Sequence, residues 1–218
     1  MVKVAKRIIE TATLLSVLYA ARRYYRNWGA TKAECQMRLP GDALVGDPVV
    51  QTTEAVYIDA PPAAVWSWLL RKGHERSGGV QDAAGAGYQG TDRVHPERQL
   101  AVGDQVRLAP PGWMGLAGGV TLRVVEIAPE KHVLLAITHP DLRRNAVWSF
   151  HLQPHWENRV RLLTRARIGL RYPGEFLALE LARPVIALGA RGLLLGIKRG
   201  VERLPMTEPE QPHPAETA

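Results

Sequence analysis

The sequence predicts an α+β domain in which an antiparallel sheet is covered by a late helix. Three features support this: an alternating strand that runs directly into a helix at Thr52–Leu70, a series of short alternating segments after Asp92, and an apolar helical stretch before Leu204. Short spacings with turn residues and no intervening helix are typical of antiparallel strands. With 218 residues, 46% hydrophobic and 22% charged, the chain can bury one sizeable core.

The first 28 residues are predicted to form a basic helix with an apolar centre. Residues 1–38 carry eight Lys or Arg against two Glu, a net charge of +6. The uninterrupted run without charge, Thr11–Ala21, is eleven residues long, whereas a bilayer span needs about 20. Two interpretations stay open: an anchor that lies in an anionic membrane surface, and a helix packed on the domain. The first implies a cytoplasmic protein that associates with membranes through residues 1–28.

Residues 29–51 are predicted to be a linker, because they contain several Gly and Pro residues and show little periodicity. The strand that follows places Glu54, Val56 and Ile58 on one face. Pro61 and Pro62 then begin a helix in which Trp66 belongs to an apolar stripe and Trp68 points elsewhere, because residues two apart do not share a helix face.

The later strands bring the expected sheet to about seven. They are predicted at Arg93–Val94, Gln105–Leu108, Val120–Ile127, Val133–Thr138, Ala146–Leu152 and Arg159–Ile168. In the last of these, apolar residues alternate with Arg159, Arg161, Arg165 and Arg167. One face of that strand is therefore predicted to be apolar, and the other to be basic and exposed to solvent.

Residues 174–204 are predicted to be helical, with Pro184 starting or kinking a second segment. Gly192, Gly196 and Gly200 recur four residues apart, which suits either close approach of a sheet or ligand, or pairing with another helix. The tail 205–218 has four prolines and a net charge of −3, and is predicted to be disordered.

Five segments in the same order resemble the START-like superfamily (SRPBCC, the polyketide cyclase/dehydrase and lipid-transport group). They are IDAPPAAVWSWL, RVHPERQLAVGDQVRLAP, RVVEIAPEKHVLLA, VWSFHLQPHWENRVRLLTRARI and LLLGIKRGVERL. The resemblance covers roughly residues 50–204 and implies a helix-grip fold, in which a curved antiparallel sheet surrounds a long C-terminal helix. It places a ligand-binding domain at residues 52–204. Val80-Gln81-Asp82 stand where relatives tend to carry aromatic residues, which leaves the substrate open.

The resemblance also implies an apolar cavity between sheet and helix. Large aromatic side chains and glycines near the enclosed face are its candidate lining. These candidate ligand-binding residues are Trp66, Tyr88, Trp113, Met114, Trp148, Gly192 and Gly196.

No catalytic or metal-binding motif is present. A single cysteine, Cys35, excludes a disulfide framework, and no HExxH, Gly-x-Ser-x-Gly or phosphate-binding pattern occurs. We therefore predict no cofactor, no metal and no catalytic residue, and the absence of nucleic-acid motifs predicts no nucleic-acid partner. The residues left for acid–base work by elimination are His74, His95, Asp104, His132 and Arg143.

Three functions fit the sequence. The leading hypothesis is a non-enzymatic carrier or sensor of a hydrophobic small molecule, lipid or polyketide-like, with an anionic membrane surface as a second partner. A cofactor-free cyclase, dehydratase or hydrolase acting in the same cavity is the alternative. A membrane-tethered interaction module with a filled core is the third.

Overall fold

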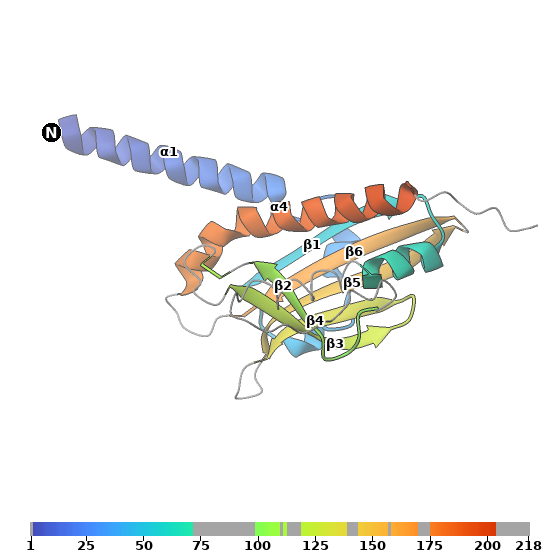
Figure 1. The fold of residues 1–218 in the computed structure, drawn as a ribbon. Coiled ribbons are helices and arrows are strands. Elements are labelled where there is room, and N and C mark those ends of the chain that lie inside the picture. Colours follow the sequence, from blue (N-terminus) through green and yellow to red (C-terminus); the bar gives the residue numbers. More distant parts are fainter. Residues whose placement is uncertain are drawn as a thin grey trace, which may run out of the picture.

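The computed structural model describes residues 2–71, 99–109, 111–112, 119–138, 144–156, 158–169 and 175–203. Its centre is a six-stranded antiparallel sheet with the order β1-β6-β5-β4-β3-β2. A long helix, α4 (Glu175–Glu202), lies across the concave side of the sheet (Figure 1). The strands are β1 (Val50–Ile58), β2 (Gln105–Ala109), β3 (Val120–Ala128), β4 (His132–Thr138), β5 (Arg144–Trp156) and β6 (Arg159–Ile168).

This architecture confirms the α+β helix-grip arrangement expected from the sequence. Each strand predicted from Gln105 onward is present, whereas the one predicted at Arg93–Val94 lies outside the described residues. Pro184 lies inside α4, so residues 175–202 form one helix and not two separate segments. Pro184 is the tenth residue of α4, so its missing N–H removes one bond of the helical ladder inside the helix.

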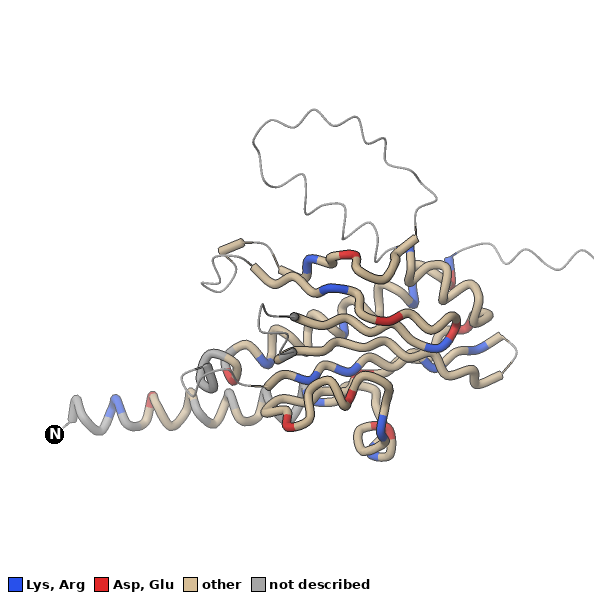
Figure 2. The backbone as a smooth tube through the Cα atoms, turned by 90° about the horizontal axis from the view of Figure 1, so that it is seen from below, with Lys and Arg blue, Asp and Glu red and all other residues tan. Residues whose placement is uncertain are grey.

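The remaining helices are shorter or extend away from the sheet. α1 (Val2–Tyr25) extends away from the rest of the chain in both Figure 1 and Figure 2. α2 (Lys32–Gln36) begins with a capping box, in which Glu34 N–H donates to Thr31 Oγ1 at 3.1 Å and Thr31 N–H donates to Glu34 Oε2 at 2.6 Å. A short 3₁₀ turn, η1 (Asp42–Leu44), follows, and another α-helix covers residues 62–71.

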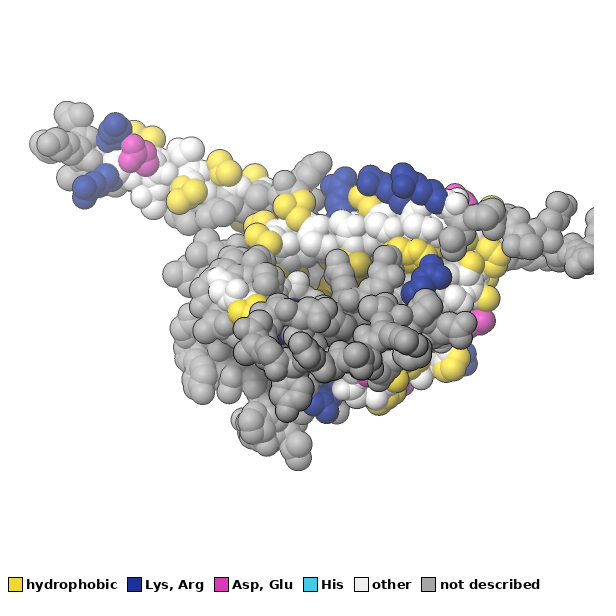
Figure 3. Space-filling view, viewed as in Figure 1, with side chains coloured by type: hydrophobic (Ala, Val, Ile, Leu, Met, Phe, Trp, Pro, Cys, Tyr) yellow, Lys and Arg dark blue, Asp and Glu magenta, His cyan; other side chains and the backbone are white. Residues whose placement is uncertain are grey.

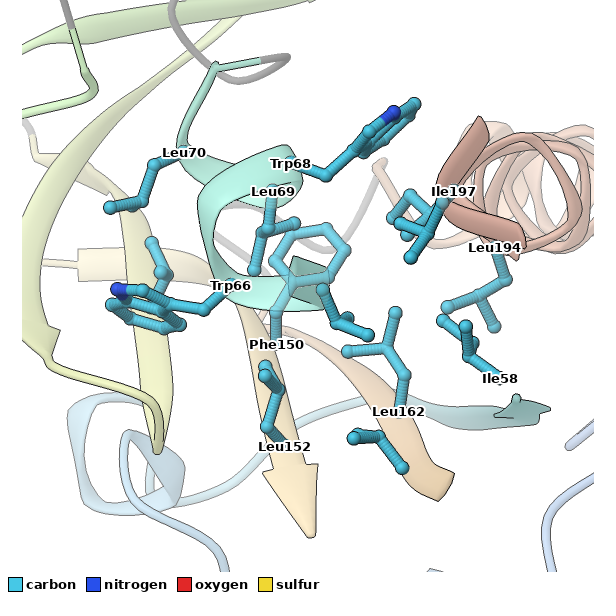
Figure 4. Close-up of a cluster of buried hydrophobic side chains, with 14 of the residues drawn as sticks. Ile58, Trp66, Trp68, Leu69, Leu70, Phe150, Leu152, Leu162, Leu194 and Ile197 are labelled. Atoms are coloured by element: carbon cyan, nitrogen blue, oxygen red, sulfur yellow. The ribbon is translucent and has the colours of Figure 1, made fainter. Parts of the chain in front are cut away.

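Most of the hydrophobic core lies between the concave face of the sheet, the helix at 62–71 and α4. Ile58, Leu162, Leu194 and Ile197 are fully buried there. Trp66 and Trp68 are both buried, but they leave the helix in different directions (Figure 4). The different directions agree with the prediction from helical spacing, and Trp68 points toward α4.

The outer face of β6 is buried at Arg161 and Arg165, so the prediction of a solvent-exposed basic face was wrong. Arg161 is 7% exposed and Arg165 is 1% exposed. The reason is that residues 29–46, part of the predicted linker 29–51, pack over this face and provide Glu34 and Asp42 as partners. Arg161 and Glu34 form an ion pair at 2.8 Å, and so do Arg165 and Asp42. The hydrogen bond from Arg161 lowers the pKa of Glu34 from its usual 4.5 to about 2.

Polar side chains attach α4 to the free edge of β1. Arg183 donates to the carbonyl of Val49 at 3.1 Å, and Lys198 donates to the carbonyl of Tyr57 at 2.9 Å. Glu202 accepts a hydrogen bond from the N–H of Asp59 at 3.0 Å. These contacts satisfy backbone groups that an edge strand would otherwise leave free, and they fix one side of α4. The other side of α4 faces β2, across the space described next.

Candidate ligand cavity

Two adjoining apolar cavities lie between α4 and the concave face of the sheet. The first has a volume of about 530 Å³ and the second about 450 Å³. Leu108, Trp148 and Gly189 line both of them, so the cavities meet at these residues. The rest of the first lining is Trp68, Leu69, Leu100, Val106, Val133, Leu135, Phe150, Gly192, Leu193, Gly196 and Ile197.

The described lining is almost wholly apolar. None of its residues carries a charge, and Asn145 in the second cavity supplies the one side-chain amide. The indole N–H of Trp148 donates to Thr164 Oγ1 at 2.6 Å, and Thr164 in turn donates to the carbonyl of Ser149 at 3.0 Å. The polar edge of Trp148 is therefore satisfied within the sheet, and the wall that it forms favours an apolar molecule.

A row of glycines on α4 forms the wall opposite the sheet. A Cβ atom added at Gly189, Gly192 or Gly196 would have no other atom within 4 Å. At Gly200, by contrast, an added Cβ would lie 2.5 Å from the Trp68 ring. Gly200 thus admits the Trp68 ring, whereas the three preceding glycines line the cavities, are exposed and face open space.

This difference predicts opposite effects for the same substitution on one helix. Gly192→Ala should stabilise the unliganded protein by up to about 1 kcal/mol, because alanine is the better helix former and meets open space. Gly200→Ala should destabilise it by about 1–3 kcal/mol, because the new methyl group overlaps a buried ring. Urea unfolding of both variants tests this, and equal effects at the two positions would contradict it.

The residues predicted to bind ligand fall into three groups. Trp148, Gly192 and Gly196 line the cavities. Trp66 belongs to the hydrophobic core and is absent from both linings. Tyr88, Trp113 and Met114 lie outside the described residues. Sequence reasoning missed Trp68 because its apolar partner, α4, is more than a hundred residues away in the chain.

Glu54 is a second residue that the sequence did not single out. Its place on the same strand face as Val56 and Ile58 was predicted, but the structure shows it fully buried. Oε2 lies 3.5 Å from Thr52 Oγ1, and Oε1 has no hydrogen-bond partner among the described residues. Burial raises the pKa of Glu54 from 4.5 to about 7. Glu54 is therefore protonated below about pH 7 and ionised above it.

The described residues place no acid–base pair on the cavity wall. Asp104 caps a turn by accepting from the N–H of Ala101 at 2.9 Å, and His132 contacts Glu126 at 2.8 Å on the other side of the sheet. The other acid–base candidates, His74, His95 and Arg143, lie outside the described residues. Within the described chain, no three His, Cys, Asp or Glu side chains form a group that could hold a metal ion. The described lining can enclose an apolar molecule.

No model of a known protein family matches the sequence, and neither does any curated protein. Solved structures do resemble the chain. The Aha1 dimer from Colwellia psychrerythraea is 18% identical and aligns over 71% of this chain and 98% of that one, with a TM-score of 0.43. The Polyketide_cyc-like protein Cgl2372 from Corynebacterium glutamicum is 13% identical over 70% and 91%, with a TM-score of 0.40. TTHA0849 from Thermus thermophilus is 17% identical over 70% and 97%, with a TM-score of 0.41.

The element order and strand order define the class of fold. The chain has one strand, a helix, a run of antiparallel strands and a long closing helix, and β6 returns beside β1, so this is a helix-grip fold. Function in such a fold depends on what lines the space under the closing helix.

Proposed function

We propose that this protein binds a hydrophobic small molecule, lipid or polyketide-like, in the cavity under α4, and acts as a carrier or sensor of it. The observation that carries the proposal is the apolar wall formed by Trp68, Trp148 and Phe150 opposite the glycine row. Each cavity volume lies in the range of small-molecule sites, roughly 300–1,000 Å³. The absence of charged groups from the described lining favours binding over catalysis.

Filling the cavity tests this proposal directly. Gly196→Phe should lower the affinity for an apolar fluorescent probe about 10- to 100-fold, because the new ring occupies the space that the probe needs. Leu188→Phe is the matched control, since Leu188 lies on α4 but lines neither cavity. Probe titration measures both variants, and native mass spectrometry of the purified wild-type protein looks for a retained lipophile. Equal probe affinities for all three proteins, with no retained molecule, would overturn the proposal.

The proposal includes a membrane surface as the place of loading or delivery. Described apolar side chains of α1, among them Leu14, Val17 and Tyr19, are about 60% exposed or more. An isolated helix with exposed apolar residues gains stability when a surface covers them. No helix among the described residues is long and apolar enough to cross a membrane. An interfacial position for α1, on the cytoplasmic side, would cover its exposed apolar side chains.

A further inference from the structure

The outward side of α4 carries exposed apolar residues in its first half and exposed basic residues in its second. Val185 is 42% exposed and Leu188 47%. Arg199 and Arg203, near the C-terminal end, are also exposed. Figure 3 shows Lys and Arg side chains gathered along this side of α4.

α1 lies on the same side of the sheet as α4 and is joined firmly to the domain. Its C-terminal end lies over α4 in Figure 1, and the guanidinium of Arg191 on α4 lies 4.7 Å from the ring centroid of Trp28. The carbonyl of Trp28 accepts from the N–H of Ala55 at 3.0 Å, and Asn27 Oδ1 accepts from the N–H of Thr53 at 3.0 Å. These bonds extend the edge of β1, so α1 leaves the domain from a fixed point.

The cavity reaches the surface at the same side of α4. Gly189, Gly192 and Gly196 line the cavities and are also exposed, and so is Val185. Because α4 is attached to β1 along its opposite side, the exposed lining lies along the unattached side. A molecule entering past these glycines would therefore come from whatever covers the outward side of α4.

We propose that α1 and the outward side of α4 form one docking surface for an anionic lipid bilayer, and that the cavity opens onto it. This helix surface comprises Leu14, Val17, Val185, Leu188, Arg199 and Arg203. Its apolar residues suit the acyl boundary and its arginines suit lipid phosphates. The acidic residues near it are paired, Glu10 with Lys6 at 3.9 Å and Glu202 with Lys198 at 2.5 Å, so the surface is basic overall. The inference rests on the proposed function and adds the route by which ligand exchanges with the bilayer.

The test compares two charge-neutralising variants of the full chain. Sedimentation with phosphatidylcholine vesicles containing about one third phosphatidylglycerol should show the Arg199→Gln/Arg203→Gln protein binding about 30-fold more weakly than wild type. Arg123→Gln/Lys131→Gln removes the same charge from exposed residues at β3 and its turn, away from the helix surface, and should bind within about threefold of wild type. Thermal unfolding checks that both variants are folded.

Probe titration without vesicles separates this inference from the proposed function. The Arg199→Gln/Arg203→Gln protein should keep wild-type probe affinity and transfer the probe more slowly between anionic vesicles. Equal loss of vesicle binding in both double variants, or no vesicle binding by wild type, would overturn the docking surface. If the variant bound vesicles more weakly but transferred the probe between them at the wild-type rate, the inference that the cavity opens onto the docking surface would be overturned. If neither wild type nor the variants bound the probe, while wild type still bound vesicles more tightly than the Arg199→Gln/Arg203→Gln protein, the ligand-binding proposal would be rejected and the docking surface would stand.

Discussion

Arg165→Ala is expected to destabilise the protein by about 3–5 kcal/mol, because it leaves a mostly buried carboxylate without its main partner. Arg165 is 1% exposed and uses all three guanidinium nitrogens. Nη1 donates to Asp42 Oδ2 and to the carbonyl of Met37, each at 2.8 Å. Nη2 donates to the carbonyl of Glu34 at 2.6 Å, and Nε donates to Thr53 Oγ1 at 3.0 Å. The substitution also removes the anchor between the outer face of the sheet and residues 34–42.

Arg159 on the same strand is the matched control. Its side chain is 37% exposed, and its partner Asp59, 3.0 Å away, is 64% exposed. Arg159→Ala should therefore change the free energy of unfolding by about 1 kcal/mol or less, since exposed ion pairs contribute little. Guanidinium chloride unfolding at neutral pH gives both values. Losses of similar size for the two arginines would show that the buried network is not what holds residues 29–46 on the sheet.

Glu54→Gln is expected to stabilise the protein by about 3 kcal/mol at pH 8 and to have little effect near pH 4.5. Burial raises the pKa of Glu54 to about 7 in the folded state, against 4.5 for an exposed carboxyl. Between these two pH values the folded protein holds a proton that the unfolded chain has lost, so the free energy of unfolding falls as pH rises. Above about pH 7 the folded protein also loses the proton and carries an unpaired buried charge. The glutamine variant avoids this loss, which the pKa difference sets at about 3 kcal/mol.

The measurement is the difference in free energy of unfolding between Glu54→Gln and wild type from pH 4.5 to pH 8. Burial also lowers the pKa of His151 to about 4, and Arg161 lowers that of Glu34, but both contributions are common to the two proteins and cancel. Glu130→Gln, at an exposed turn, controls for the change from carboxyl to amide and should stay within about 0.5 kcal/mol. A difference that does not grow with pH would mean that Glu54 has a partner in solution.

The cavity shows why the sequence could predict a ligand-binding domain but only some of the residues that line its cavity. The position of Trp148 on an inward-facing strand follows from alternation, and the glycine spacing on α4 is visible in the sequence. Which glycine meets a side chain and which meets open space depends on Trp68, which arrives from a distant helix. A contact between segments so far apart in the chain leaves no local pattern from which to predict it.

Alternation and turn residues by themselves predicted the antiparallel strands and the residues that share each strand face, and the apolar stretch at 174–204 predicted the late helix, because these follow from local backbone geometry. Only the tertiary structure decided what covers each face. The arginines of β6 alternate like a solvent-exposed row, yet residues 29–46 bury Arg161 and Arg165. The covering residues have no periodicity of their own. Glu54 likewise shares a strand face with Val56 and Ile58, but its full burial is a property of the assembled fold. Burial and ion pairing are set by packing between segments distant in sequence, so they are properties of the fold and not of the strand.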